Sequence, residues 1–308
     1  MSTTSAIMRI IRTYFDLPEE DRSAVIALGN FDGVHCGHQV VIGEAIVIAK
    51  TLGVSSAAMT FDPHPRRFFQ PNTPPFEMTP SNAKSRQLEL LGTDIHYAIP
   101  FDKDFSSLDG KTFIENVLVE GLRVRHIVAG FNFVFGKGRK GNVRLLEKCG
   151  KEHGFGVTIV SAVQAGGGKA YSSTVIRSHI QEGRPREAAD LLGRLWEIEG
   201  EVMTGDQRGR QIGFPTANLE ISEMVMLPND GVYYVKVVEG KEVFSGMCNI
   251  GFRPTIGSQK NRCIEVHLIN KEGIDLYGKK IKIIIIKFIR NETKFNSMEE
   301  LKGQLIID

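Results

Sequence analysis

Two histidines, His35 and His38, stand three residues apart where an apolar run meets a segment with a helical pattern. The apolar run 24–28 predicts a strand, the turn after it is punctuated by glycines, and 39–52 predicts a helix. Glycines let backbone N–H groups approach an anion, and a helix N-terminus supplies partial positive charge. Two imidazoles on one side of the first helical turn add donors. The segment therefore predicts a phosphate site for a nucleoside triphosphate whose α-phosphate is attacked.

The residues that we expect to hold the nucleotide in this turn lie between the strand and the helix. They are Gly29, Phe31, Asp32, Gly33 and Gly37. The alternative is a plain strand, turn and helix in which both histidines only cap backbone groups, a risk that accompanies every short motif. A zinc site of the metalloprotease type is disfavoured, because the H-E-x-x-H spacing is missing and no third ligand motif is evident.

Two loops that follow predicted strands in the first half are further candidates. Asp62 and His64 stand in a loop stiffened by prolines, for which a simple rigid turn is the alternative. The loop 130–141 combines aromatic residues, glycines and cations. Aromatic side chains can hold a planar ring while amides and cations meet phosphates, so we single out Asn132 and Phe133 there. A solvated basic loop is the alternative.

A third candidate segment opens a predicted helix with three hydroxyl residues at 172–174 and an arginine one turn further on. A plain N-cap would need only one hydroxyl. Beside a nucleotide site, Ser173, Thr174 and Arg177 are typical of a grip on a pyrophosphate.

The second half has its own glycine-rich turn, which contains Gly209 and Gly213 and runs into Thr216 and Asn218. In an extended chain the last two side chains point the same way, so their oxygens could share a Mg²⁺ that also binds phosphate oxygens. Amides of the glycine loop would contact the nucleotide. Two polar side chains on the solvated face of a strand are the alternative.

Glu265 and His267 lie on one face of a predicted strand, 264–268. A cross-strand charge pair would explain them without any function. If that face looks into a site, Glu265 is the candidate general base, because a carboxylate can take a hydroxyl proton as phosphoryl transfer proceeds.

Two kinds of architecture must position these residues. The first half alternates predicted strands with predicted helices, which indicates a parallel sheet covered on both faces, with ligands at the carboxyl ends of its strands. The strands are 24–28, 56–61, 95–99, 126–129 and 157–160, and the helices are 39–52, 82–91, 111–120, 143–153 and 174–182.

After 183–185 a short helical segment, 187–195, precedes β-rich runs separated by glycine and asparagine turns. The runs are 200–203, 232–238, 243–250, 264–268 and 281–289, followed by a helix at 298–306. They predict a small antiparallel barrel or sandwich closed by a terminal helix. We therefore expect two domains, 1–185 and 186–308.

Composition narrows the class of protein. The chain has 308 residues, 42% of them apolar, and a net charge of +2, with no basic block interleaved with aromatics that would favour nucleic acid. Its four cysteines show no C-x-x-C spacing, which predicts a reducing cytoplasm. The most apolar run, 281–289, is short and contains two lysines, so we expect a soluble protein without a membrane span.

In its motifs the chain resembles, over nearly its whole length, the family of bifunctional bacterial riboflavin kinases/FAD synthetases. The H-x-G-H pattern at 35–38 is similar to that of its FMN adenylyltransferase module, a nucleotidylyltransferase. The flavokinase module is matched by Gly-Phe-Pro-Thr-Ala-Asn-Leu at 213–219, Gly-Val-Tyr at 231–233, Asn-Ile-Gly-Phe-Arg-Pro-Thr at 249–255, Glu-Val-His-Leu at 265–268 and Asp-Leu-Tyr-Gly at 275–278.

The resemblance implies roles at matching positions. In the first module His35 and His38 would contact ATP phosphates, and Arg177 would act with them. Asp62, His64, Asn132 and Phe133 would bind flavin, and Ser173 and Thr174 nucleotide. In the second module Thr216 and Asn218 would bind Mg²⁺ with the nucleotide, Glu265 would activate the ribityl 5′-hydroxyl, and Arg290 would lie near the flavin phosphate.

The resemblance thus implies an enzyme that phosphorylates riboflavin to FMN with ATP and then adenylylates FMN to FAD with release of pyrophosphate. Both steps would use Mg²⁺, with no nucleic-acid, membrane or obligate protein partner. One alternative is a monofunctional flavokinase with an impaired first half, because Asn132 and Asn142 stand where aspartate is frequent in the family. The other is a flavin-binding regulatory or carrier protein. Thr216, Asn218 and Glu265 argue against it, since binding flavin alone needs no metal ligands or base.

Overall fold

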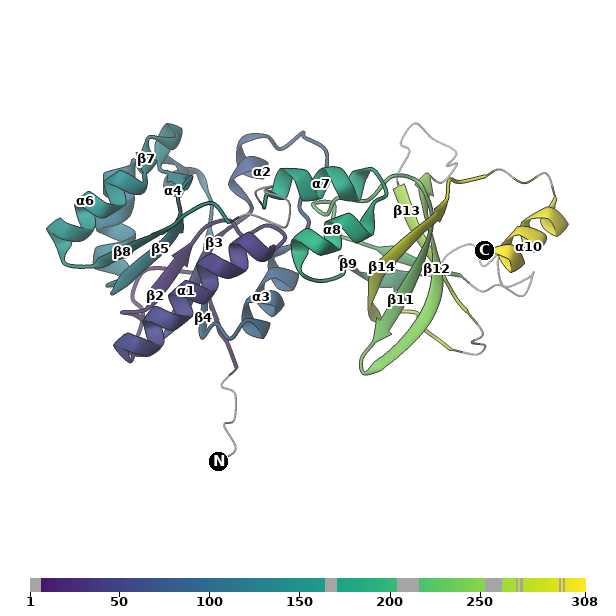
Figure 1. The fold of residues 1–308 in the computed structure, drawn as a ribbon, viewed down its shortest axis with the longest axis horizontal. Helices are drawn as coiled ribbons and strands as arrows, with labels where there is room; N and C mark the ends of the chain where they lie inside the picture. Colours follow the sequence, from purple (N-terminus) through teal and green to yellow (C-terminus); the bar gives the residue numbers. More distant parts are fainter. Residues whose placement is uncertain are drawn as a thin grey trace, which may run out of the picture. The chain divides into compact units, whose positions relative to one another are not determined.

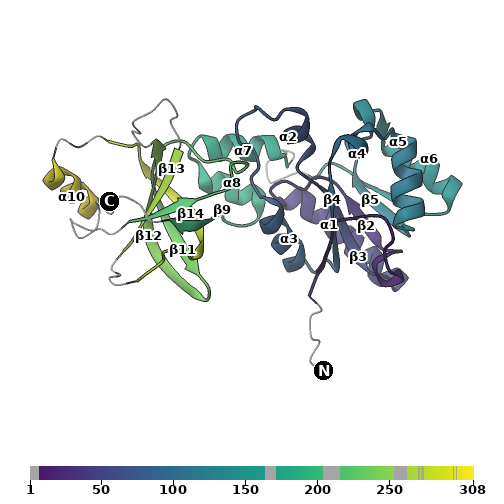
Figure 2. The same ribbon diagram turned by 180° about the vertical axis from the view of Figure 1, so that it is seen from behind.

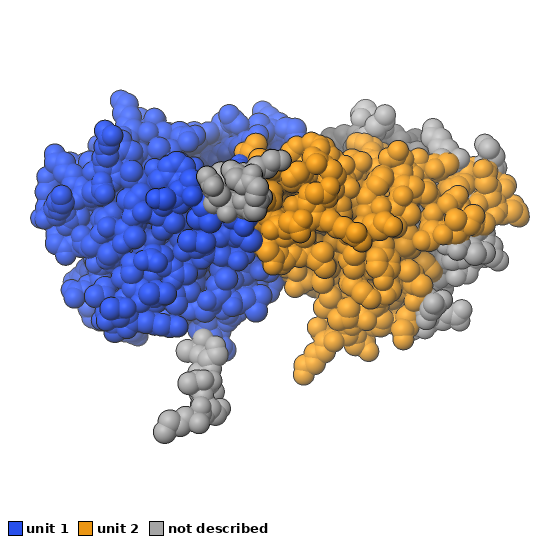
Figure 3. Space-filling view, viewed as in Figure 1, with its two compact units in different colours: residues 1–74, 79–172 blue, residues 75–78, 173–308 orange. Residues whose placement is uncertain are grey.

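The computed structural model divides into two compact units, each formed by two stretches of the chain. It describes residues 7–163, 171–203, 216–252, 262–269, 271, 274–293, 295 and 297–308. Unit 1 comprises residues 1–74 and 79–172, and unit 2 comprises 75–78 and 173–308 (Figure 3). The predicted boundary at 185/186 separates two catalytic modules rather than two compact units, and it stays a prediction.

Unit 1 is built on a six-stranded parallel sheet with the order β1-β4-β3-β2-β5-β8 (Figure 1). Its strands are β1 (Arg9–Ile11), β2 (Val25–Leu28), β3 (Ser56–Asp62), β4 (Ile95–Pro100), β5 (His126–Gly130) and β8 (Gly156–Val160). The central strands are buried over most of their length because helices cover both of their faces. Five of the six strands match the predicted runs; β1 was not predicted.

The helices of unit 1 form two layers. They are α1 (Cys36–Leu52), α2 (Pro65–Phe69), α3 (Ser81–Leu90), α4 (Lys103–Ser107), α5 (Gly110–Thr112) with its π-helical continuation η2 (Phe113–Gly121), and α6 (Val143–His153). Alternate residues of β2 pack on opposite sides: Val25 and Ala27 against α1 and α3, and Ile26 and Leu28 against η2 and α6. This is the doubly wound arrangement that the alternation of elements predicts.

Short connections complete unit 1. They are the 3₁₀ turns η1 (Glu19–Asp21) and η3 (Lys137–Arg139), and the two-residue strands β6 (Val134–Phe135) and β7 (Gly141–Asn142). The last two pair with each other at the end of the glycine-rich loop 130–141, so residues 134–142 form a small hairpin.

Unit 2 is a closed antiparallel barrel with the order β10-β13-β12-β11-β14-β9 (Figure 2). Its strands are β9 (Glu197–Met203), β10 (Thr216–Glu220), β11 (Gly231–Glu239), β12 (Glu242–Phe252), β13 (Arg262–Leu268) and β14 (Lys280–Arg290). Alternate residues such as Val235, Cys248 and Val266 fill the interior. The structure thereby selects the barrel over the sandwich, and the helix α10 (Met298–Ile307) lies where the sequence predicts it.

Unit 2 also contains three segments that precede the barrel strands in the chain. They are helices α7 (Ser173–Gln181) and α8 (Pro185–Leu192) and the segment 75–78. The amide of Glu77 donates to the carbonyl of Met224 (3.1 Å), and the indole N–H of Trp196 donates to the carbonyl of Met78 (3.0 Å). No periodic pattern in 75–78 predicts this contact with residues more than a hundred positions away.

Within the part of the chain that the structure describes, no helix is both long and apolar enough to cross a membrane.

Candidate active sites

The turn between β2 and α1 has an unusual backbone. Phe31, Gly33 and Val34 all have positive φ, at 48°, 87° and 42°. Such angles cost free energy for residues other than glycine, so the surrounding packing must hold them. Phe31 and Val34 are 3% and 1% exposed in the apolar cluster beneath α1, which supplies that packing. The turn is therefore a rigid support for the two histidines.

His35 and His38 are in direct contact. The His35 side chain is the N-cap of α1, and its Nδ1 accepts a hydrogen bond from the His38 amide (3.2 Å). Because Nδ1 accepts, the neutral ring carries its proton on Nε2. The two rings stack with centroids 3.5 Å apart and planes 18° from parallel. The capping alternative is thus realised by His35, and it places the two rings together at the N-terminus of α1, where an anion is favoured.

The small residues around the histidines allow close approach. A Cβ at Gly29 would lie 2.8 Å from the Phe31 ring, and one at Gly37 would lie 3.0 Å from Cβ of Tyr171. Tyr171 in turn stacks on His35 at a centroid distance of 6.4 Å. Sequence reasoning missed Tyr171, because it stands far along the chain outside any motif.

Asp32 has a structural bond that the sequence did not predict. Its side chain is 3% exposed and accepts a hydrogen bond from the amide of Thr79 (3.1 Å). The carboxylate therefore ties the histidine turn to the segment before α3. Its predicted contact with the nucleotide stays a prediction.

The remaining candidates of unit 1 follow β3 and β5. Asp62 ends β3 and pairs with Arg12 (3.4 Å), and His64 caps α2 by accepting from the Arg66 amide (3.1 Å). Asn132 lies in the turn after β5, and the Phe133 ring stacks on Phe135 at 5.5 Å and packs against the core.

All of these candidates extend from the carboxyl ends of parallel strands, because β2, β3 and β5 are adjacent and run the same way. Ligand sites of doubly wound sheets form at this edge. The side chain of Asn142, which departs from the family pattern, has a clear local role: it caps α6 by accepting from the Leu145 amide (3.2 Å).

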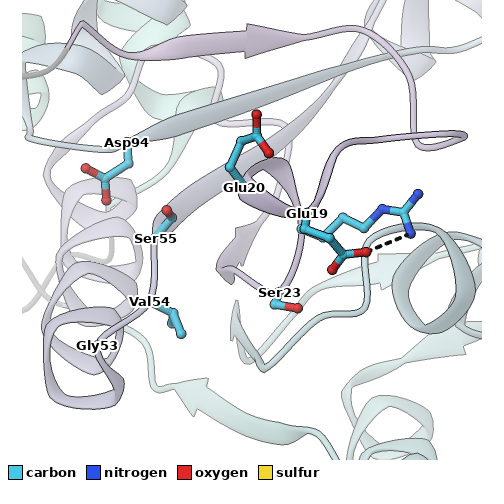
Figure 4. Close-up of a pocket in the computed structure, with 8 residues that line it drawn as sticks. Glu19, Glu20, Ser23, Gly53, Val54, Ser55 and Asp94 are labelled. Carbon is cyan, nitrogen blue, oxygen red and sulfur yellow. Dashed lines mark ion pairs between the residues drawn. The ribbon is translucent and has the colours of Figure 1, made fainter.

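A hollow of about 520 Å³ lies at the opposite, amino-terminal edge of the same sheet (Figure 4). Its lining includes Glu19, Glu20 and Asp94, and Glu19 pairs with Arg22 at 3.8 Å. None of the predicted site residues lines it.

Ser173, Thr174 and Arg177 stand at the start of α7, in unit 2. The Arg177 Nε donates to the carbonyl of Phe76 (2.8 Å), and its guanidinium lies over the Phe76 ring at 5.5 Å. The segment 75–78 therefore holds the Arg177 side chain in position.

Three polar residues form a row across the barrel. On β10, Asn218 is paired in register with Glu265 of β13, and Glu265 is paired on its other side with Asn249 of β12. Directly opposite residues of antiparallel strands share a face and have Cβ atoms about 5 Å apart. Their strand neighbours Leu219, Ile264 and Ile250 are in the core, so this row faces outward.

Two residues further along the same strands, Thr216 of β10 is paired in register with His267 of β13. Thr216 and Asn218 thus lie on the same face as Glu265, as the spacing predicts. A hydroxyl, an amide and a carboxylate are the hard oxygen donors that suit Mg²⁺. These residues therefore fit a magnesium ion that is shared with phosphate oxygens.

The sequence did not predict the roles of two residues near Glu265, which are Asn249 and Glu292. Asn249 donates through Nδ2 to Oε1 of Glu292 (2.9 Å). A Cβ at Gly251 would overlap the Glu292 carboxylate, so glycine is required for Glu292 to lie there. Asn249 belongs to the motif at 249–255, but only the strand register reveals that it lies opposite Glu265.

Arg290 is held by a carboxylate. Its Nε donates to Oδ1 and Oδ2 of Asp308 (2.8 and 3.0 Å), and a second guanidinium nitrogen donates to Oδ2 (2.6 Å). Burial raises the pKa of Asp308, but hydrogen bonds from Arg290 and Gln304 outweigh it and lower the pKa overall. A guanidinium that grips a carboxylate in this way also has the geometry to grip a phosphate. Gly209 and Gly213 lie outside the described residues.

Comparisons with known proteins agree with this architecture. Residues 17–175 match the family model for FAD synthetase, and residues 192–308 match the model for riboflavin kinase. A bifunctional riboflavin kinase/FMN adenylyltransferase of Bacillus subtilis is 42% identical, covering 94% of this chain and 91% of its own. The protein of the same name from Escherichia coli is 37% identical, over 98% and 96%.

Among solved structures, a protein described as a macrolide-efflux protein from Streptococcus pneumoniae shares the whole fold. It has a TM-score of 0.85 and 31% identity, and the match covers 98% of this chain and 97% of that one.

A parallel doubly wound unit with paired histidines, joined to a closed barrel with a row of oxygen donors, defines a two-module enzyme of nucleotide chemistry. The chain belongs to the family of bifunctional riboflavin kinases/FMN adenylyltransferases.

Proposed function

We propose that the chain converts riboflavin to FMN and then FMN to FAD, with ATP as co-substrate in both steps. The observation that carries this proposal is the outward row of Asn218, Glu265 and Asn249 on three neighbouring barrel strands. The presence of both family models and of full-length bifunctional relatives supports the two-step reaction over the monofunctional alternative.

In the kinase step, Glu265 is the general base. Its carboxylate takes the proton of the ribityl 5′-hydroxyl as that oxygen attacks the γ-phosphorus of ATP, and ADP leaves. Thr216 and Asn218 would hold Mg²⁺, which offsets charge on the phosphates when bound. Asn249 lies beside Glu265 and would orient its carboxylate. Arg290 would bind the flavin phosphate after leaving Asp308.

In the adenylyl step, an oxygen of the FMN phosphate attacks the α-phosphorus of ATP, and pyrophosphate leaves. The nucleophile is already an anion, so no base is needed, and the site must reduce repulsion between two anions. His35 and His38 at the N-terminus of α1 suit that task. The other predicted roles are nucleotide binding by Ser173, Thr174 and Arg177 and flavin binding by Asp62, His64, Asn132 and Phe133.

One assay tests the proposal. Purified protein is incubated with riboflavin, ATP and Mg²⁺, and riboflavin, FMN and FAD are separated by chromatography over time. FMN should form first and FAD second, and supplied FMN should give FAD without riboflavin. FMN without FAD would identify a monofunctional kinase, and no turnover of either substrate would identify a flavin-binding protein. A magnesium requirement is tested by adding a chelator, and a cytoplasmic location remains a prediction from the cysteine pattern.

A further inference from the structure

A second polar cluster lies on the barrel, apart from the row of Asn218, Glu265 and Asn249. The Nζ of Lys236 donates to Oγ of Ser245 (2.8 Å), and the hydroxyl of Tyr234 donates to the same oxygen (3.2 Å). Lys236 on β11 and Ser245 on β12 are direct partners in the antiparallel register.

The cluster faces outward. Val235 and Val237, the strand neighbours of Lys236, are in the core, and so are Phe244 and Cys248 on β12. Tyr234, Lys236 and Ser245 themselves are neither exposed nor fully buried. Their polar ends are thus partly withdrawn from water but within reach of a ligand, which strengthens electrostatic interactions relative to a fully solvated group.

Donors outnumber acceptors in this cluster. The Ser245 oxygen receives hydrogen bonds from both neighbours, which leaves its own O–H as a third donor directed elsewhere. Among the described residues, no carboxylate lies within ion-pair distance of the Lys236 ammonium. The hydrogen bond with Ser245 and the positive charge of Lys236 lower the pKa of the Tyr234 hydroxyl. The Tyr234 proton is already donated to Ser245, so the donors that remain are the other N–H bonds of Lys236 and the Ser245 O–H, beside one positive charge.

Two other lysines of the barrel, in contrast, have carboxylate partners. Lys282 lies 3.3 Å from Glu197, and Lys279 lies 3.3 Å from Glu239. The charge near Tyr234 is increased further by Lys287, its register partner on β14, which is exposed. A ligand that completes this arrangement must be an acceptor with negative charge.

We propose that Tyr234, Lys236 and Ser245 form a binding site for a small phosphate-class oxyanion, distinct from the kinase centre. Ser245 and Asn249 are four residues apart on β12, which corresponds to about 13 Å along a strand. One phosphoryl group cannot reach both places. The oxyanion is either free phosphate or pyrophosphate, or a phosphoryl group of a nucleotide bound to the barrel.

Calorimetric titration of the full chain with pyrophosphate, and separately with inorganic phosphate, tests the site. Lys236→Met removes the charge and keeps the length of the side chain. Lys241→Met is the matched control, because it removes the same charge from the exposed tip of the same hairpin. Both catalytic centres also bind phosphates, so the comparison is between the variants rather than with zero binding.

If the ligand is a free oxyanion, wild type and K241M should bind one more equivalent of the anion than K236M, or bind the anion at least about tenfold more tightly. The KM for ATP in the kinase assay should then be the same in all three proteins. For a nucleotide phosphoryl group, K236M should raise the KM for ATP or FMN by a similar factor while K241M does not. Ser245→Ala, which removes the shared oxygen, should reproduce whichever result is found, and circular dichroism verifies that each variant is folded. Equal anion binding and equal KM values in K236M, S245A and K241M would overturn the proposal.

Discussion

Glu265 stands directly opposite Asn218 on neighbouring antiparallel strands, so a carboxylate and an amide oxygen share one outward patch of the barrel. Glu265→Gln keeps the size of this side chain and removes its proton acceptor. We expect the chemical step of riboflavin phosphorylation to slow by about a hundredfold to ten-thousandfold, the usual contribution of general base catalysis. Rapid-quench measurement of FMN formation gives the rate of that step.

Two controls accompany the Glu265 variant. Riboflavin affinity should change little, because the amide preserves the shape of the site, and conversion of supplied FMN to FAD should continue. A near-normal quench rate would mean that Glu265 is only a strand-face residue and that a loose transition state needs no base.

His38→Ala should affect the other reaction. Removing one donor that stabilises developing charge typically costs on the order of a hundredfold in rate, so FAD formation from FMN should fall by about that factor. Riboflavin phosphorylation in the same preparation should persist. His35→Ala would change stability as well as activity, because His35 also caps α1 and loss of the cap destabilises the helix. If both activities fell together in H38A, the assignment of two separate centres would be wrong.

The sequence predicts most of the fold because its signals are local. An apolar run such as 24–28 marks a strand buried on both faces, and amphipathic segments mark the helices. Short edge elements lack such a signal: β1 has three residues, and β10 carries only Ala217 and Leu219 as apolar residues in its five.

Long-range geometry explains what the sequence could not predict at the sites. Spacing places Thr216 and Asn218 on one face, but only the register of β12 with β13 brings Asn249 beside Glu265. The contact between Glu292 and Asn249 depends in the same way on tertiary packing. Asp32 was predicted for its motif, and its hydrogen bond to Thr79 joins residues 47 positions apart.

The segment 75–78 should stabilise the barrel unit. Met78 is 1% exposed within the barrel's core, and its carbonyl accepts from the buried Trp196 indole. A fragment covering 173–308 lacks these contacts, and an unpaired buried donor costs about 1–3 kcal/mol. A synthetic peptide of residues 72–80 should therefore raise the melting temperature of the fragment.

A peptide with Met78→Asp is the matched control for this measurement and should have little effect, because it would bury a charge. An equal melting temperature with and without the native peptide, at concentrations up to the millimolar range, would contradict the role of 75–78 in the barrel unit.

His96 should make the stability of unit 1 dependent on pH. The ring is 0% exposed, and its Nε2 and Nδ1 lie 2.8 Å from the hydroxyl oxygens of Thr60 and Ser85. Burial, with the nearby charges of Lys84 and Arg12, lowers the pKa of His96 to about 3. In the unfolded chain a histidine titrates near 6.5, so below that pH the unfolded state binds the extra proton.

Stability should consequently decline as the pH falls from about 6.5 toward 3, and His96 alone contributes up to about 1.4 kcal/mol per pH unit. His96→Gln retains hydrogen-bonding groups but cannot titrate. Urea denaturation should show a lower free energy of unfolding for this variant than for wild type at pH 7.5. Between pH 6.5 and 4.5, however, the free energy of unfolding of the variant should fall less steeply with pH, by up to about 1.4 kcal/mol per pH unit. His126 is a useful comparison: burial also lowers its pKa, but it is only partly buried, so His126→Gln should remove a smaller part of the slope. An H96Q profile parallel to wild type would show that His96 takes up its proton in the folded state.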